Sequence, residues 1–226
     1  MHKVICLLFI FVIVGYSQTS ESNLNIGIIG GLNFNSAAVE ILEEGADVSG
    51  NTVIGIGGVI DWRLNQTFSL RLEPMYLQKG IGKTELDINP GIYWYSNSSY
   101  LEIPILIKAE FGNNVRPYFI LGPSIGLLLE TEVTAEMKSI TFKGDSKSAT
   151  EKIDMSLAFG GGIDYPISRF LIFIEARYLY GLSNNIKGGV FELSTKNVAE
   201  EIEWSKDTDK LLNRGLQIMA GITFPL

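Results

Sequence analysis

The chain has 226 residues, with 18 Lys and Arg against 25 Asp and Glu, so its formal net charge is −7. An acidic balance without a basic patch argues against a nucleic-acid-binding protein. The single His and the single Cys are His2 and Cys6. The chain beyond position 6 therefore has no disulfides, no His-dependent hydrolytic triad and no zinc site of the usual His/Cys type. We predict no catalytic residues, no metal site and no cofactor.

The first 17 residues, MHKVICLLFIFVIVGYS, have the layout of a secretory signal peptide. Lys3 gives a short basic start, and small residues at Gly15 and Ser17 follow an apolar run over positions 4–14. This run is shorter than the roughly 20 residues that a membrane-spanning helix needs. We predict cleavage before Gln18, with residues 18–226 forming one exported domain.

Beyond this segment, apolar residues recur with a period of two, which is typical of strands with two different faces. In YLEIPILIKAEF (100–111) every odd position is apolar, whereas Glu102, Lys108 and Glu110 lie at even positions. We predict eight strands at about 24–35, 53–64, 68–83, 100–111, 116–131, 152–165, 170–183 and 212–226. They indicate an all-β protein, an antiparallel up-and-down barrel. Extra short strands within 132–150 or 185–212 would raise the count to ten.

Two features indicate that the apolar face points outward, into lipid. The predicted connections alternate between short and long, and the short ones fall near 65–67, 112–115 and 166–169. Outer-membrane barrels have this arrangement, with short periplasmic turns and long external loops. Aromatic residues also gather on the apolar face near the short turns and predict a girdle at the membrane–water interface. They are Trp62, Phe68, Phe111, Phe119, Tyr165, Phe170 and Phe224.

The opposite face carries acids and bases among small residues, which suits a narrow interior where opposite charges pair. The predicted ion-pair network of this lumen consists of Arg71, Glu73, Glu102, Lys108, Asp154, Glu175 and Arg177. Two carboxylate pairs, Glu73 with Glu102 and Glu175 with Asp154, are formally possible, but pairing with the bases is favoured. A one-residue slip would turn Lys108 toward lipid at a cost of about 2–4 kcal/mol. The pattern therefore fixes its own register.

Three prolines, Pro74, Pro104 and Pro123, lie inside predicted strands. Each removes a backbone donor, and a closed barrel has no edge strand that could hold it. We therefore expect bulges or local kinks at these positions.

Several segments are similar to those of a known family. YLEIPILIKAEF, RPYFILGPSIGLLLE, FGGGIDYPI, EARYLYGLSN and the terminal GLQIMAGITFPL resemble the small outer-membrane β-barrels described as "porin family" or "outer membrane protein beta-barrel domain". The resemblance covers nearly all of residues 18–226 and implies the same fold and an outer-membrane location in a Gram-negative-type envelope. Members of this family share no agreed active site, so the resemblance implies no functional residues.

The segment GIYWYSNSSY (91–100) is a candidate recognition segment because it clusters aromatic side chains. Tyr93, Trp94 and Tyr95 either contact an external ligand or belong to the tops of two neighbouring strands. We predict a monomeric, non-enzymatic barrel in outer-membrane lipid, with a structural or adhesion role through its external loops. The alternatives are a narrow pore for ions or small solutes and a soluble periplasmic binder of the lipocalin type. The sequence does not identify an external ligand or partner.

Overall fold

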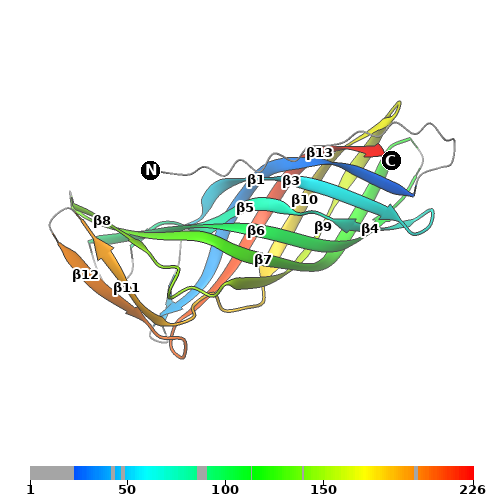
Figure 1. The fold of residues 1–226 in the computed structure, drawn as a ribbon. Coiled ribbons are helices and arrows are strands. Elements are labelled where there is room, and N and C mark those ends of the chain that lie inside the picture. Colours follow the sequence, from blue (N-terminus) through cyan, green and yellow to red (C-terminus); the bar gives the residue numbers. More distant parts are fainter. Residues whose placement is uncertain are drawn as a thin grey trace.

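The computed structural model describes residues 23–41, 44–46, 49–85, 91–112, 114–138, 140–195 and 198–226. The predicted signal peptide lies outside these residues. All regular elements within them are strands of one antiparallel sheet (Figure 1). No helix in this part of the chain is long and apolar enough to cross a membrane.

The sheet closes into a ring with eight strand positions, which confirms the predicted barrel. The ring consists of β1 Leu24–Ile41, β3 Asn51–Arg63, β4 Phe68–Leu72 with β5 Met75–Glu85, β6 Ile92–Glu110, β7 Arg116–Met137, β9 Ile153–Ile167, β10 Phe170–Gly181 and β13 Lys210–Pro225. β4 and β5 share one position because both pair with β3 on one side and β6 on the other. The ring closes where β1 pairs with β13, from Asn25↔Pro225 to Glu40↔Lys210. A short strand, β2 Glu44–Ala46, continues from β1 and pairs back onto it.

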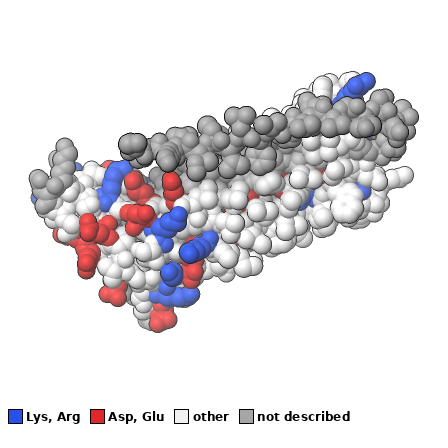
Figure 2. Space-filling view, viewed as in Figure 1, with Lys and Arg blue, Asp and Glu red and all other residues white. Residues whose placement is uncertain are grey.

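Apolar side chains point away from the barrel axis, and charged side chains point into it. On β10, Ile172 and Ile174 are 42% and 57% exposed, whereas Glu175 and Arg177 are each 1% exposed. On the face seen in Figure 2 the flank of the barrel is accordingly almost free of charged atoms, and red and blue atoms gather at the long-loop end. A lipocalin-type barrel would turn its apolar face inward, so the soluble alternative is wrong.

Three tight connections lie together at one end of the barrel, as the alternation of short and long connections predicts. Asn65 shapes the first by accepting hydrogen bonds from the backbone N–H groups two and three residues on, at 2.9 and 2.8 Å. Gly112 begins the second with a φ of 89°, a conformation that favours glycine. The third consists only of Ser168 and Arg169, between β9 and β10.

The predicted girdle residues lie on the outer surface near these turns. All seven are between 39% and 68% exposed. Phe170 and Phe224 meet edge to face with ring centroids 5.0 Å apart, and Phe111 and Phe119 meet similarly at 6.3 Å. Their position at a membrane–water interface remains a prediction.

The three prolines interrupt the ladder without shifting its register, so the bulges expected at these positions do not form. Pro74 separates β4 from β5, yet the two strands continue one register against β3 and β6. The register of β6 against β7 is likewise unchanged across Pro104 and Pro123. The carbonyl oxygens of Pro74 and Pro104 still accept backbone hydrogen bonds from neighbouring strands, at 2.9 and 3.2 Å, which holds the strands in place. The register shifts lie elsewhere, at Ser99/Tyr100 and Ile81/Thr84.

At the long-loop end the strands run beyond their predicted bounds and carry a small additional sheet. β7 turns back into β8 Ile140–Asp145, which is followed in the sheet by β11 Gly189–Ser194 and β12 Ala199–Trp204. We call residues 92–97, 131–137, β8, β11 and β12 the external sheet, which stands at the left end of Figure 1. Short strands therefore do form within 132–150 and 185–212, but they lie beside the ring, which keeps eight positions.

The external sheet has an apolar core of its own. The core consists of buried Val133, Ala135, Ala149, Phe191 and Leu193, with Ile92, Trp94, Phe142, Ile202 and Trp204 packed against it. The rings of Phe191 and Trp204 meet edge to face at 4.7 Å. Because of this core, the external sheet is a packed structural unit.

Candidate functional site

Two arginines occupy the centre of the lumen. Arg71 binds Asp61 through two hydrogen bonds of 2.7 Å, from Nε to Oδ1 and from Nη2 to Oδ2. Its Nη1 also donates to Glu175 Oε2 at 3.2 Å. Arg177 donates through Nη1 to Glu73 and, at 3.2 Å, to Glu175 Oε1. Because Glu175 joins both arginines, these five residues form one connected cluster, which we call the central layer.

Aromatic rings and an amide complete the central layer. Tyr118 donates its hydroxyl hydrogen to Glu175 Oε2 at 2.9 Å, and the Arg71 guanidinium carbon lies 4.7 Å from the ring centroid of Phe173. Arg177 Nε donates to Gln217 Oε1 at 2.5 Å. Cation–π contacts of this kind strengthen when the site is removed from water. The layer is therefore packed as well as paired.

A second cluster, the outer layer, lies nearer the long loops. Lys79 Nζ is 2.7 Å from Glu102 Oε2 and 2.8 Å from Asp154 Oδ2. Asn213 donates to the same Asp154 oxygen at 3.0 Å, and the ring centroid of Tyr100 lies 5.0 Å from Lys79 Nζ. One lysine thus holds two carboxylates from different strands.

A third cluster, the inner layer, lies toward the tight turns. Lys108 Nζ is 2.5 Å from Asp164 Oδ2 and 2.7 Å from Glu110 Oε1. The ring of Tyr118 lies 4.3 Å from the same ammonium group, so this layer is packed against the central one.

Acids outnumber bases inside the barrel. Among the described residues, the buried lumen charges are six carboxylates (Asp61, Glu73, Glu102, Asp154, Asp164 and Glu175) and four bases (Arg71, Lys79, Lys108 and Arg177), and each is at most 5% exposed. Each base contacts at least two carboxylates. Loss of any base would therefore remove a positive charge from at least two carboxylates.

The seven residues of the predicted lumen network all lie within these layers. Sequence reasoning left Asp61, Lys79 and Asp164 out of that set, although their period-two position places them on the same face. The structure also groups the carboxylates differently from the two pairs considered. Lys79 joins Glu102 to Asp154, whereas the arginines join Glu73 to Glu175.

Two loops cover the external end of the lumen. We call residues 146–152 and 182–188 the mouth loops. They are tied to each other by the Thr150↔Ile186 bridge and by a hydrogen bond from the backbone N–H of Glu151 to the carbonyl of Asn185, at 2.8 Å. Asn185 in turn donates its backbone N–H to Leu211 of β13 at 2.9 Å. The loops are thereby fastened to the barrel rim.

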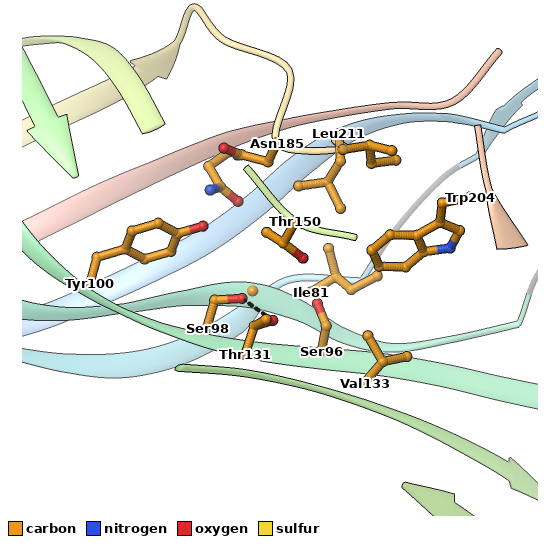
Figure 3. Close-up of a pocket in the computed structure, with 13 residues that line it drawn as sticks. Ile81, Ser96, Ser98, Tyr100, Thr131, Val133, Thr150, Asn185, Trp204 and Leu211 are labelled. Carbon is orange, nitrogen blue, oxygen red and sulfur yellow. Dashed lines mark hydrogen bonds between the residues drawn. The ribbon is translucent and has the colours of Figure 1, made fainter. Parts of the chain in front are cut away.

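A small cavity with both polar and apolar side chains in its lining lies between the mouth loops and the outer layer (Figure 3). Its volume is about 30 Å³, which leaves room for about two water molecules. Ser98 and Thr131 line it, joined by a 2.7 Å hydrogen bond, and Tyr100 lies on its barrel side. Asn185 lines it from the loops, is 3% exposed, and has no hydrogen-bond partner for either amide atom among the described residues. The cavity suits ordered water, which can satisfy a buried amide.

The three aromatic residues considered for recognition lie on β6 within the external sheet. Trp94 points into its apolar core. Tyr93 is 39% exposed and lies under Lys83, whose Nζ is 4.8 Å from the ring. Tyr95 donates to Glu136 at 3.3 Å, and the hydrogen bond from Lys83 to Glu136 lowers the pKa of Glu136 and raises that of Lys83. The cluster of aromatics is thus divided between core and surface.

Replacing Phe191 by alanine tests whether the external sheet is a packed unit. Phe191 is 4% exposed, and removing a buried aromatic ring typically costs about 3–5 kcal/mol. We expect Phe191→Ala to open the external sheet to added protease while the barrel itself stays folded. Protease digestion followed by mass spectrometry, with mobility on unboiled gels for the barrel, measures both. Val190→Ala, at an exposed neighbouring position, is the control, and equal resistance of the two variants would contradict the expectation.

A closed β-barrel with charges inside and apolar residues outside defines a transmembrane barrel of the outer-membrane type. The chain also matches the family "Outer membrane protein beta-barrel domain" over residues 16–187 and belongs to this family. It is therefore a small outer-membrane β-barrel protein, a class in which the short turns lie in the periplasm and the long loops outside.

Solved structures show the same fold at low sequence identity. The outer membrane protein OprG from Pseudomonas aeruginosa matches at TM-score 0.50 and 10% identity, over 90% of this chain and 96% of that chain. A major outer membrane protein from Thermus thermophilus matches at 0.53 and 8%, over 89% and 98%. No curated protein sequence matches the chain significantly.

Proposed function

We propose that this protein is a non-conducting, non-enzymatic surface barrel that presents the external sheet to the outside of the cell. The observation that supports this most directly is the filled lumen, in which three ion-paired layers lie under the mouth loops. An eight-stranded barrel is just wide enough for side chains to fill its interior. The external segments would then carry the function, as is common for loops held on a rigid scaffold.

The external sheet supports a structural or adhesion role. It extends past the barrel rim, has its own apolar core, and exposes Tyr93 beside Lys83 on its surface. A preformed surface loses less conformational entropy on binding than a flexible loop does. We also propose that the barrel is a monomer, because outward apolar residues occur on every strand of the ring and suit lipid around the whole circumference.

Planar-bilayer recording of the detergent-refolded protein tests the closed lumen. We expect no conductance steps from the wild type, because Arg71 and Arg177 fill its cross-section. The matched variant is Glu73→Ala with Arg177→Ala, which removes both partners of one contact and opens space. Conductance steps from this variant alone would mean that the central layer closes the lumen. No steps from either protein would mean that the mouth loops also block it. Steady conductance of the wild type would overturn the proposal in favour of a narrow pore.

A further inference from the structure

The periplasmic end of the barrel contains a vestibule that the proposed function does not use. Its volume is about 520 Å³, within the usual range for small-molecule sites. Its lining includes Asn23, Arg63, Asn65, Gln66, Glu110 and Arg116. Glu110 also belongs to the inner layer through its 2.7 Å contact with Lys108. The vestibule therefore ends at the filled lumen and can hold a molecule but not pass one through.

Hydrogen-bond donors predominate in the lining. Arg63 and Arg116 supply two guanidinium groups, of which that of Arg116 also has contacts within the protein. Glu110 is the single acid among the described residues of the lining. One oxygen of Glu110 is held by Lys108, and the other lies 4.0 Å from Arg116 Nη1. Asn65 uses its carbonyl oxygen inside its own turn, which leaves its NH₂ group as the end that a ligand can reach. The described part of the lining thus carries a net positive charge and offers donors, which suits an anion.

The two guanidinium groups come from different walls of the barrel. Arg63 ends β3 and Arg116 begins β7, and the ring places β4 and β6 between these strands. A carboxylate is satisfied by one guanidinium fork, whereas a phosphate has enough oxygens for two. We propose that the vestibule binds a phosphate group between Arg63 and Arg116. The group belongs either to a phospholipid head group of the inner leaflet or to a soluble phosphate compound of the periplasm.

Calorimetric titration with inorganic phosphate tests this site on the full-length barrel in octyl glucoside, a detergent without phosphate. We expect one phosphate to bind the wild type and the affinity to fall at least tenfold in Arg63→Gln with Arg116→Gln. The control is Arg169→Gln, which removes an exposed arginine at the same end but outside the vestibule, and it should bind as the wild type does. Mobility on unboiled gels verifies that each variant is folded. Absence of binding by the folded wild type, or equal binding by the double variant, would overturn the proposal.

The same titration separates the two sources of phosphate. If the natural occupant is a lipid head group, added phosphatidylglycerol will compete with inorganic phosphate in detergent, and binding will vanish in phosphatidylglycerol vesicles. If it is a soluble compound, phosphate will bind equally in both settings. The Arg63→Lys with Arg116→Lys variant keeps the charge but loses the planar forks, so we expect an intermediate affinity. An affinity equal to that of the wild type would show that charge alone attracts phosphate and would overturn the two-fork site.

Discussion

Replacing Arg177 by leucine should lower the free energy of unfolding by about 3–5 kcal/mol, the usual loss when one partner of a buried ion pair is removed. Arg177 is 1% exposed and contacts Glu73, Glu175 and Gln217. Leucine would fill part of the space but leave Glu73 and Glu175 with Arg71 as their one neighbouring base among the described residues, at 3.5 and 3.2 Å. Among the described residues the lumen holds six buried acids against four bases, so Arg71 alone would then be shared by Asp61, Glu73 and Glu175.

Urea unfolding of the refolded barrel in lipid vesicles measures this loss, and Arg169→Leu is its control. Arg169 lies in an exposed two-residue turn, where a substitution usually changes stability by at most about 0.5 kcal/mol. The double variant Glu73→Leu with Arg177→Leu should recover part of the loss, because replacing a whole buried pair by apolar residues is often neutral. A single variant as stable as the wild type would show that water reaches the central layer, which would favour the pore.

The membrane-spanning part of the fold could be predicted from the sequence because a charged side chain in lipid has a high free energy. Lys108 cannot face hydrocarbon without a cost of about 2–4 kcal/mol. The alternation of apolar and charged residues in one strand therefore decides which of its faces points to lipid. The same alternation places Asp61 and Lys79 in the lumen. It does not give their height along the barrel axis, which depends on strand tilt and on register across the ring.

The partners of the lumen charges therefore could not be predicted. Lys79 on β5 meets Asp154 on β9, and Arg177 on β10 meets Glu73 between β4 and β5. These partners lie 75 and 104 positions apart in the chain. Alternation within a strand contains no information about such contacts. This is why the carboxylate pairs considered from sequence differ from the groups in the structure.

The sequence predicts extra short strands within 132–150 or 185–212, but the parts of β6 and β7 that belong to the external sheet were not predicted, for a related reason. Beyond the membrane neither face of a strand is required to be apolar, so the alternation weakens where the sequence reads YWYSNSS (93–99) and ETEVTAEM (130–137). Both segments are nevertheless strands, within β6 and β7. Phe191 and Trp204 were the available signal, because both rings belong to the apolar core of this sheet.

Replacing Ile174 by arginine should lower the free energy of unfolding by about 2–4 kcal/mol in vesicles, if the residue lies near the bilayer midplane. Ile174 lies midway along β10, between Ile163 on β9 and Ala220 on β13. Its side chain is 57% exposed, so the substitution creates no clash and no cavity in the lumen. The cost arises only from placing a guanidinium group in hydrocarbon.

Val190→Arg is a close control, because Val190 is 50% exposed but lies on β11 of the external sheet, opposite Glu203. In water such a substitution should change stability by at most about 0.5 kcal/mol. Urea unfolding of both variants in the same vesicles compares the two surroundings directly. Equal effects at the two positions would mean that the flank of β10 is not in lipid. A large effect at Ile174 alone would show that two apolar residues of similar exposure differ in the solvent that they face, which is the physical basis of this fold.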